Sequence, residues 1–351
     1  MDERVSEHAA TLLDWSARIE AGDEVIVRVD EGAHDLAVAV AEGLGERGAT
    51  LLATYESDEL NRAYRRAYEG EFDTRESARA MYEQADVVLR LSGTWNTAGR
   101  ADVPNDRQAA YRRADRPVRE ARTGADWVST LHPTRALAQQ AGMAYEEYRE
   151  FVYDAIVRDW ESLADEMARL KTVLDEGSEV AIEAPGTEVE MRIDGRTAVN
   201  SAASVAYDSH NLPSGEVFTA PYATDGHVTF DVPATVDGRR VRNVRLTFEN
   251  GEVVDWSAET GEELVGELGI GMNRGIDRFT DNVLFDEKMG DTIHLAVGRA
   301  YDACLPDGEA GNDSAVHQDF ISDVSEDSQL RVDDEVIQRN GRFRWEDGFE
   351  E

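Results

Sequence analysis

The chain has 351 residues, of which 73 are acidic and 36 are lysine or arginine, so its net charge at neutral pH is −37. This length is enough for two domains, because single hydrophobic cores usually stop growing at roughly 250 to 300 residues. The sequence contains no run of about 18 apolar residues that would cross a bilayer. A dense negative surface also disfavours nucleic acid and anionic membranes as partners.

The acidic residues are spread along the whole chain, and Lys171 and Lys288 are its only lysines. Such a surface repels itself in dilute buffer, whereas at about 1 M salt the Debye length falls to roughly 3 Å and the repulsion is screened. This composition is typical of cytoplasmic proteins from extreme halophiles. We also expect a cytoplasmic location because the N-terminal residues do not form a secretory signal. Cys304 is the sole cysteine, so a metal site would need histidine and carboxylate ligands.

Short apolar strands alternate with amphipathic helices from the N-terminus to about residue 175. The hydrophobic spacing predicts helices at 3–21, 33–47, 58–68, 75–84 and 145–171, and strands at 23–29, 50–55, 86–91 and 127–131. Strands that alternate with helices predict βαβ units and a parallel sheet covered by helices. We therefore expect residues 1–175 to form an α/β N-terminal domain.

Short alternating runs separated by Gly, Pro, Asn and Asp follow residue 175. They predict antiparallel strands at 179–183, 187–193, 243–248 and 252–256. Asn250-Gly251 is a hairpin turn of the Asn-Gly kind, and a second hairpin is predicted around Asn340-Gly341. We expect residues 176–351 to form a β-rich α+β C-terminal domain.

Two segments resemble ligand-binding motifs without meeting all the requirements of those motifs. The segment from Gly43 to Gly48 matches the GxGxxG pattern, but it lies in the second half of a predicted helix and not directly after a strand. We interpret Arg47 and Gly48 as the end of that helix, and a P-loop lysine is also missing. The acidic loop 307–313 does not follow the twelve-residue ligand pattern of a calcium-binding loop. Both observations weigh against a nucleotide-binding or calcium-binding protein.

Residues that ligate metals gather in the second half of the chain. Glu216 follows a Pro- and Gly-rich turn, and Glu267 lies among apolar residues, where an unpaired carboxylate is costly to bury. His317 and Asp319 are two residues apart, so on a strand both side chains face the same side and can chelate one ion. The segment 284–320 adds three further candidates, which are Glu287, His294 and Tyr301.

Each candidate has an alternative interpretation without metal. In these interpretations Glu216 is an ordinary acidic residue of a turn, His294 is a hydrogen-bonded core histidine, and Tyr301 is a packed aromatic residue. The position of Lys288 beside Glu287 suits either a role near the substrate or simple charge compensation. The residues interpreted as structural or solvated are His132, His210, His227, Glu262 and Glu263.

Five short motifs follow one another in the second half of the chain. They are the residues 211–221 around Glu216, Gly266-Glu-Leu-Gly269, Leu284-Phe-Asp-Glu287, Ile293-His-Leu-Ala-Val-Gly298 and His317-Gln-Asp-Phe320. In this order, and with seven residues from His294 to Tyr301, they resemble the thermophilic-type metallo-aminopeptidases of peptidase family M29. The overall layout agrees with the family along the chain, whereas the specific motifs occupy residues 211–320.

The resemblance implies a dinuclear metal site, with zinc, cobalt, manganese or magnesium as its two divalent ions. It implies peptide substrates with a free N-terminus, a homodimer, and hydrolysis by a water that the metals activate. Tyr301 would be catalytic through a hydrogen bond to the oxyanion, and Glu267 would act as ligand, general base or both. The implied metal ligands are Glu216, Glu267, Glu287, His294, His317 and Asp319.

The sequence also departs from the family pattern. Two additional residues separate Glu287 from His294, and the segments 216–267 and 301–317 are shorter than the pattern, as is the first domain. The ligand set itself is complete. The shorter segments leave open whether the substrate range and the dimer contacts of the family apply to this chain. A catalytically drifted metal-binding or peptide-binding protein of the same fold is the alternative to an aminopeptidase.

Overall fold

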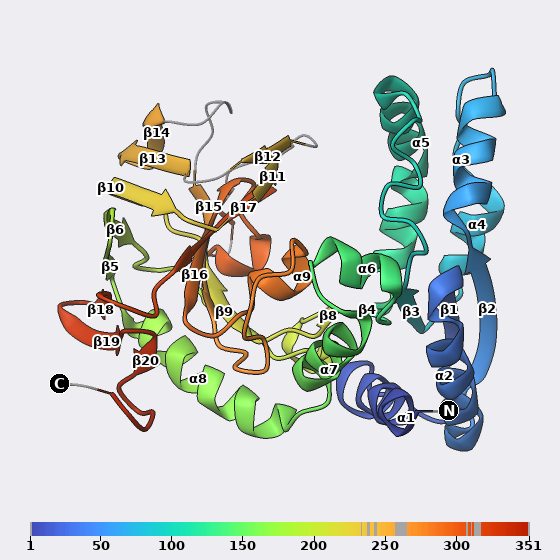
Figure 1. Cartoon of the computed structure of the whole chain (residues 1–351), viewed down its shortest axis with the longest axis horizontal. Helices are drawn as coiled ribbons and strands as arrows, with labels where there is room; N and C mark the ends of the chain where they lie inside the picture. Colours follow the sequence, from blue (N-terminus) through green and yellow to red (C-terminus); the bar gives the residue numbers. More distant parts are fainter. Residues whose placement is uncertain are drawn as a thin grey trace. The chain divides into compact units, whose positions relative to one another are not determined.

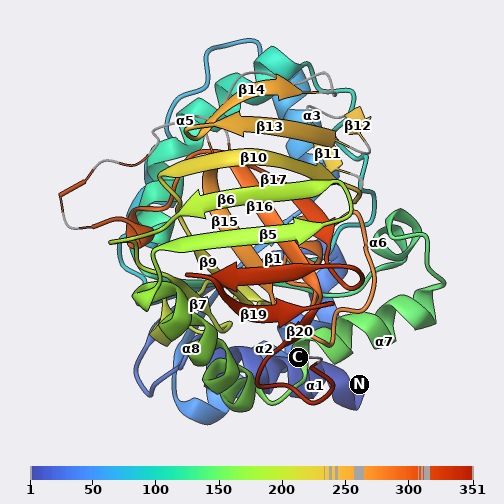
Figure 2. The same ribbon diagram turned by 90° about the vertical axis from the view of Figure 1, so that its left-hand side faces the viewer.

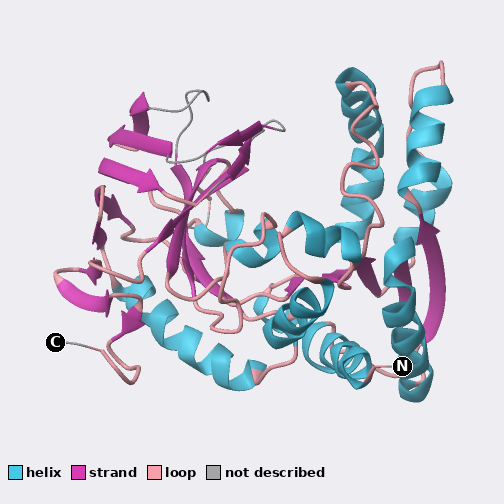
Figure 3. Cartoon of the chain, in the orientation of Figure 1, coloured by secondary structure: helices cyan, strands magenta, loops and turns pink. Residues whose placement is uncertain are grey.

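Figure 1 shows a computed structural model of the chain, which describes residues 2–232, 234–236, 239–241, 244–256, 265–306, 308–309, 311 and 317–349. The chain divides into two compact units, which we call unit 1 (residues 1–158 and 203–213) and unit 2 (residues 159–202 and 214–351). Helices are prominent in unit 1 and strands in unit 2 (Figure 3). The domain boundary near residue 175 stays a prediction; the contact-based division places helix α8 (Trp160–Glu176) in unit 2.

Unit 1 contains a five-stranded parallel sheet with the strand order β2-β1-β3-β4-β8. The central strands β1 and β3 are rich in Val, Ile and Leu, and most of these side chains are buried, as a sheet covered on both faces requires. The edge strand β2 is largely exposed. The strands are β1 (Glu24–Asp30), β2 (Thr50–Glu56), β3 (Val87–Ser92), β4 (Asp126–Leu131) and β8 (Asn211–Leu212).

Helices connect the strands of this sheet. Helix α2 ends at Arg47, and Gly48 caps it with a left-handed φ of 73°, so the GxGxxG match lies inside a helix as predicted. Helix α5 is absent from our sequence prediction because its arginine-rich surface leaves little hydrophobic periodicity. The helices are α1 (Glu3–Ala10), continued by a π-helix (Thr11–Ser16), α2 (His34–Arg47), α3 (Asp58–Ala67), α4 (Glu76–Tyr82), α5 (Asn105–Thr123), α6 (Arg135–Gln140) and α7 (Tyr145–Ile156).

The helix predicted over 145–171 is two helices, α7 and α8. Asp159 begins the second one, because its side chain accepts a hydrogen bond from the Ser162 backbone N–H at 3.0 Å. Within α8, apolar residues recur on one face and are buried. None of the helices in the described ranges combines the length and hydrophobicity needed to cross a bilayer.

Unit 2 contains an eight-stranded antiparallel sheet with the order β14-β13-β10-β6-β5-β18-β19-β20. The predicted Asn250-Gly251 turn joins β13 to β14, and the predicted Asn340-Gly341 turn joins β19 to β20. A further turn at Asp333-Asp334 joins β18 to β19. The strands are β5 (Glu179–Ala184), β6 (Thr187–Arg192), β10 (Ala223–Phe230), β13 (Val244–Glu249), β14 (Glu252–Trp256), β18 (Gln329–Val332), β19 (Glu335–Arg339) and β20 (Arg342–Phe343).

A second antiparallel sheet of unit 2 has five strands in the order β17-β16-β15-β9-β7. The eight-stranded sheet runs across it (Figure 2), and the rings of Phe230 and Phe320 pack between the two with centroids 5.3 Å apart. Helix α8 packs against β7 and β9, and every residue of β16, which lies between β17 and β15, is buried. The strands are β7 (Val199–Ser201), β9 (Glu216–Thr219), β15 (Val265–Gly271), β16 (Thr292–Gly298) and β17 (His317–Asp323).

Candidate metal centre

Neighbouring strands of the five-stranded sheet bring the candidate ligands of unit 2 together. Because β9, β15, β16 and β17 lie side by side, residues far apart in the sequence share one face of the sheet. The short helix α9 (Val283–Asp286) adds one more residue at its C-terminal end. The side chains delivered in this way are Glu216 from β9, Glu267 from β15, His294 from β16, His317 and Asp319 from β17, and Glu287 after α9.

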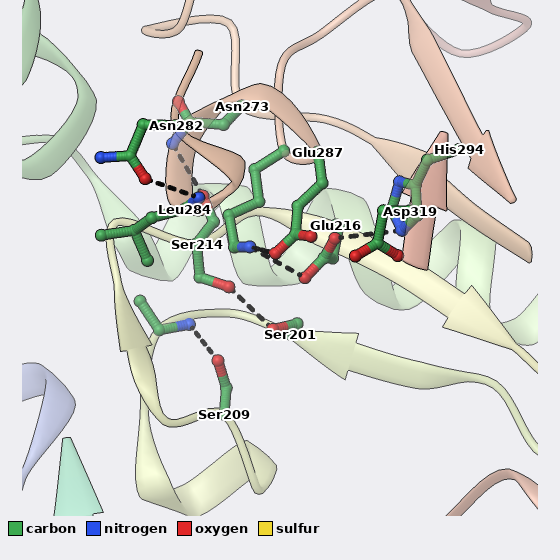
Figure 4. Close-up of polar contacts among 12 residues, drawn as sticks. Ser201, Ser209, Ser214, Glu216, Asn273, Asn282, Leu284, Glu287, His294 and Asp319 are labelled. Atoms are coloured by element: carbon green, nitrogen blue, oxygen red, sulfur yellow. Dashed lines mark hydrogen bonds and ion pairs between the residues drawn. The ribbon is translucent and has the colours of Figure 1, made fainter. Parts of the chain in front are cut away.

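The two imidazoles each lie between carboxylates. His294 Nε2 is 3.2 Å from Glu267 Oε1 and 3.6 Å from Glu216 Oε2. His317 Nε2 is 3.5 Å from Glu267 Oε2 and 3.4 Å from Asp319 Oδ1. One potential ligand atom from each of Glu267, His294 and Asp319 lies within 4.8 Å of the others. Figure 4 shows the carboxylates of Glu216 and Asp319 beside His294.

Lys288 is a buried cation beside Glu216 and Glu287 in this cluster. It is completely buried, its Nζ donates a hydrogen bond to Glu287 and lies 3.4 Å from Glu216 Oε1. A buried ammonium group is stable only when carboxylates compensate its charge. Burial opposes that charge, but Glu216 and Glu287 outweigh burial and raise the pKa of Lys288. These contacts favour charge compensation over a direct contact with substrate.

The space that the His294 ring occupies depends on a glycine in the neighbouring strand. Gly269 pairs with His294 across β15 and β16, and a Cβ atom at Gly269 would lie 2.0 Å from the imidazole Cε1. Any other residue at this position would therefore displace the ring. The Glu-Leu-Gly motif carries this signal in the sequence, but only the strand register shows which histidine depends on it.

The loop before Glu287 is fixed by a residue that the sequence analysis missed. The buried carboxylate of Asp286 accepts hydrogen bonds from Thr280 N, Thr280 Oγ1 and Asn282 N at 2.8, 2.8 and 3.1 Å. Asn282 in turn caps α9 by accepting a hydrogen bond from Leu284 N at 3.2 Å. Burial raises the pKa of Asp286 to about 6. Asp286 thus orders the segment that delivers Glu287.

Asn273 is a second missed residue. Its side-chain amide donates to Ser214 O at 2.8 Å, and its backbone N–H donates to Lys288 O at 2.9 Å. It therefore ties the turn before Glu216 to the segment that contains Lys288. Nothing in the surrounding Gly-Met-Asn-Arg sequence distinguishes it from a surface asparagine.

Tyr301 lies at the edge of the cluster, just beyond β16. Its ring packs against Phe218 at a centroid distance of 5.6 Å and meets the ring of His317 edge-on at 5.0 Å. The side chain is 46% exposed, which leaves it accessible from solvent beside a buried group of carboxylates.

The sequence matches the family described as thermophilic metalloprotease (M29) over residues 1–343. The chain belongs to the M29 family. It is 24% identical to Aminopeptidase PepS of Streptococcus thermophilus, across 91% of this chain and 92% of that protein. It is 27% identical to Aminopeptidase T of Thermus aquaticus, across 97% of this chain and 98% of that protein.

The M29 chain is also similar to a solved structure, described as wild-type AmpT from Thermus thermophilus. The TM-score is 0.83, the sequences are 24% identical, and the match covers 97% of this chain and 99% of the other. This likeness confirms the predicted fold class, with its parallel sheet in the N-terminal part and antiparallel sheets in the C-terminal part. The family match confirms the resemblance stated from the motifs and the predicted enzyme class, a metallo-aminopeptidase hydrolase.

Several side chains of this candidate centre have raised pKa values and therefore hold protons more tightly than usual. Burial raises the pKa of Glu216 to about 7 and also raises that of Glu287. Burial disfavours the charged form of His294, but the hydrogen bond that it donates to Glu267 and the nearby carboxylates raise its pKa to about 9. For His317, burial is likewise outweighed by Asp319, and the pKa rises to about 9. A cation entering the centre therefore replaces protons.

Three carboxylate oxygens show that the centre suits a cation. Glu216 Oε2, Glu267 Oε2 and Asp319 Oδ1 are buried and accept no hydrogen bond from the described residues. Buried carboxylate oxygens normally have hydrogen-bond partners. Oxygen and imidazole donors are those that zinc, cobalt, manganese and magnesium use in proteins. The donor set therefore fits a divalent metal.

The other singled-out residues lie away from this cluster or outside the description. His132 and His210 belong to unit 1, where His210 stacks on Trp127 at a centroid distance of 4.4 Å. His227 is half-buried on β10 of the eight-stranded sheet. Glu262 and Glu263 lie outside the described residues, as does most of the acidic loop 307–313.

Proposed function

We propose that this M29 chain is an aminopeptidase that removes the N-terminal residue of peptides with the help of two divalent metal ions. The observation that carries this proposal is the group of four carboxylates and two imidazoles, in which three buried carboxylate oxygens accept no hydrogen bond from the described residues. The proposed ligands are Glu216, Glu267, Glu287, His294, His317 and Asp319.

The donor set has the charge that two divalent ions require. Its four carboxylates together match the charge of both ions, and two of them, Glu216 and Glu287, also lie at ion-pair distance from the ammonium of Lys288. When bound, the ions would lower the pKa of a water toward about 7, polarise the scissile carbonyl and bind a free α-amine. The last property supports a preference for peptides with an unblocked N-terminus.

Tyr301 is the proposed donor to the oxyanion. Burial and the charges of Glu267 and Asp319 raise its pKa, so the phenol keeps its proton at neutral pH and acts as a hydrogen-bond donor. Packing against Phe218 and His317 fixes the ring, while its exposed edge stays accessible to a peptide. The accumulation of negative charge on the tetrahedral intermediate would strengthen this hydrogen bond relative to the ground state.

Glu267 is the proposed proton acceptor as well as a ligand. Its Oε1 is paired with His294 at 3.2 Å, whereas its Oε2 accepts no hydrogen bond from the described residues. The two oxygens therefore have different surroundings, and one of them is available to take the proton of the attacking water. Protonation of the leaving amine would follow from the same carboxyl group.

Chelation tests the proposed activity. We expect dialysis against a chelator in molar salt to abolish hydrolysis of an aminoacyl p-nitroanilide, and a divalent metal to restore it. The N-acetylated form of the same substrate is the matched control, and it should remain uncleaved. An enzyme insensitive to chelation would rule out metal catalysis. A chain that binds metal but cleaves neither substrate would favour the drifted binding protein.

Elemental analysis tests the number of ions and the ligand set. We expect two divalent ions per chain and a lower metal content in His317→Ala, because this imidazole lies 3.4 Å from Asp319 within the centre. His227→Ala, a histidine of the eight-stranded sheet, is the control and should keep the metal content of the wild type. One ion per chain in an active enzyme would reject the dinuclear site and leave the peptidase assignment in place.

We also propose that the enzyme is a cytoplasmic homodimer adapted to high salt. The net charge of −37 supports the salt requirement, since screening relieves the repulsion within so acidic a chain. The homodimer follows from the family resemblance. Light scattering across a salt series measures the molar mass of the particle in solution. We expect the mass of two chains in molar salt, and the mass of one chain there would reject the homodimer.

A further inference from the structure

The parallel sheet of unit 1 has a cavity at the carboxyl ends of its strands. The chain passes from β1 to β2 on one side and then to β3 on the other, so the strand order reverses between β1 and β3. Ligands of open α/β sheets bind where this reversal opens a crevice. A cavity of about 730 Å³ lies there, lined by Asp30 at the end of β1 and by Ser92 and Gly93 at the end of β3. This volume is within the range of small-molecule sites.

Hydrogen bonds fix the walls of this cavity. Gly32 N donates to Gly93 O at 2.8 Å, and a Cβ at Gly32 would lie 2.3 Å from that same oxygen. Thr94 Oγ1 donates to Asp58 Oδ2 at 2.9 Å, and Thr134 Oγ1 donates to Thr94 O at 2.8 Å. The loops after β1 and β3 are therefore held together by the chain itself, and the cavity is formed without a ligand.

The charge around this cavity differs from that of the whole chain. Six arginines and five acidic residues line it, whereas the chain has twice as many acidic as basic residues. Three of the five acids are already paired, because Asp58 contacts Arg100, Glu56 contacts Arg28, and Asp115 contacts Arg75. Within the described residues, four of the lining arginines have no carboxylate at ion-pair distance. They are Arg65, Arg90, Arg112 and Arg119.

Arg65 is the buried member of this group. Only 8% of it is exposed, its guanidinium stacks on the ring of Tyr111 at 4.0 Å, and its Nε donates no hydrogen bond to any described residue. A buried guanidinium without a carboxylate is costly unless another anion compensates it. Because Arg65 lines the cavity, an anionic ligand bound there would supply the compensating charge.

Helix α5 supplies further arginines along the same cavity. Arg112, Arg116 and Arg119 recur at steps of four and three residues, so they lie on one face of the helix. Helices α3 and α5 lie side by side (Figure 1), and thus the buried arginine of α3 and the exposed arginines of α5 border one space. Arg116 is paired with Glu120 at 2.7 Å, which leaves Arg112 and Arg119 for a ligand.

We propose that this cavity binds a small molecule that carries an oxyanion, either a phosphate or a carboxylate group. Arg65 would hold the oxyanion inside the cavity, and Arg112 and Arg119 would attract it at the surface of α5. Guanidinium groups recognise both oxyanions through paired N–H donors. The site lies wholly in unit 1 and does not depend on the metal centre of unit 2.

Calorimetric titration of the metal-loaded protein with inorganic phosphate and with succinate tests this site. We expect at least one of the two anions to bind, and Arg65→Met to weaken that binding by about tenfold or more, since charged hydrogen bonds are lost. Arg79→Met is the matched control, because Arg79 is an exposed arginine of unit 1 that pairs with Glu76 and Glu83 outside the cavity. It should bind like the wild type.

A charge reversal on α5 keeps the test decisive if Arg65→Met fails to fold. Arg112 is exposed, so Arg112→Glu should fold and still bind the anion more weakly than the wild type. Binding of phosphate alone would identify a phosphorylated ligand, and binding of succinate alone a carboxylate. Anions held by the metals would bind both variants as they bind the wild type. That result, or no binding of either anion, would overturn the proposal.

Discussion

The candidate metal centre of unit 2 and the arginine-lined cavity of unit 1 concentrate charges of opposite sign within one very acidic chain. In unit 2, buried carboxylate oxygens of Glu216, Glu267 and Asp319 accept no hydrogen bond from the described residues, although imidazole nitrogens lie 3.4 to 3.6 Å away. In unit 1, acids such as Asp58 and Asp115 are paired with arginines, and the buried Arg65 is left without a carboxylate. The charge of the ligand expected at each site follows from these local groups and not from the net charge of −37.

The two regions also differ in how the fold supports them. The ligands of unit 2 come from adjacent antiparallel strands whose register sets each side chain, as it places Gly269 opposite His294. The arginines of unit 1 come from helices beyond the ends of parallel strands, where loops and helix faces border a hollow space. A strand-built centre suits fixed coordination, and a cavity at strand ends suits a small molecule.

The two lysines give the strongest test of the electrostatic balance in unit 2. Lys288 is buried between Glu216 and Glu287, whereas the side chain of Lys171 is 33% exposed and pairs with Asp175 four residues away. We expect Lys288→Met to destabilise the metal-free protein by about 3 kcal/mol or more, because it leaves buried carboxylates without their cation. Chemical denaturation at neutral pH measures this loss.

Lys171→Met is the matched control for that substitution. It removes a partly exposed ion pair and the hydrogen bond from Lys171 Nζ to Ala198 O at 2.6 Å, and should cost about 1 kcal/mol. Added divalent metal should reduce the loss in Lys288→Met, since it supplies the missing positive charge. Equal losses in the two variants would show that Lys288 does not compensate the centre.

Tyr301 gives a smaller effect that separates catalysis from metal binding. We expect Tyr301→Phe to keep its metal and to lose about 10²-fold in turnover, since one donor to the oxyanion is removed while the ring packing on Phe218 persists. Steady-state kinetics and elemental analysis on the same preparation measure both quantities. Tyr222→Phe removes the hydroxyl of another tyrosine in the same unit whose overall exposure is similar, 45% against 46%, and should keep full turnover. Normal turnover in Tyr301→Phe would exclude the oxyanion role.

The sequence was most informative where local patterns determine structure. The alternation of apolar runs predicted the parallel sheet and the antiparallel strands, and Asn250-Gly251 marked its turn directly. Helix α5 was missed because its exposed arginines provide weak hydrophobic periodicity, although they line a cavity in the structure. The single helix expected over 145–171 is broken because the Asp159 side chain starts a new helix.

The candidate ligands were predicted from motifs, whereas their supporting residues were not. His317 and Asp319 share a strand face by simple alternation, and this relation is visible in the sequence. The roles of Asn273 and Asp286 depend on hydrogen bonds that form only when loops meet in three dimensions. The burial of Lys288 could not be predicted either, because a lysine beside a glutamate is usually a surface pair.

Histidines extend the contrast between the two units and give the smallest expected effect. Carboxylates raise the pKa of His294 in unit 2 to about 9, whereas burial and the charge of His132 lower the pKa of His8 in unit 1 to about 3. His8 is fully buried, and its Nε2 lies 2.7 Å from Thr130 Oγ1. Because the folded chain binds this proton more weakly than the unfolded chain, the stability contributed by neutral His8 is complete above pH 6.5 and is lost as the pH falls toward 3.

The stability difference between the wild type and His8→Gln should therefore shrink on acidification. We expect a change of up to about 1.4 kcal/mol per pH unit below pH 6.5, the limit for one linked proton. Unfolding measured at constant salt between pH 7 and pH 5 gives this slope, with the carboxylates common to both proteins cancelling in the difference. A difference that stays constant across this range would mean that His8 is not held neutral by the fold.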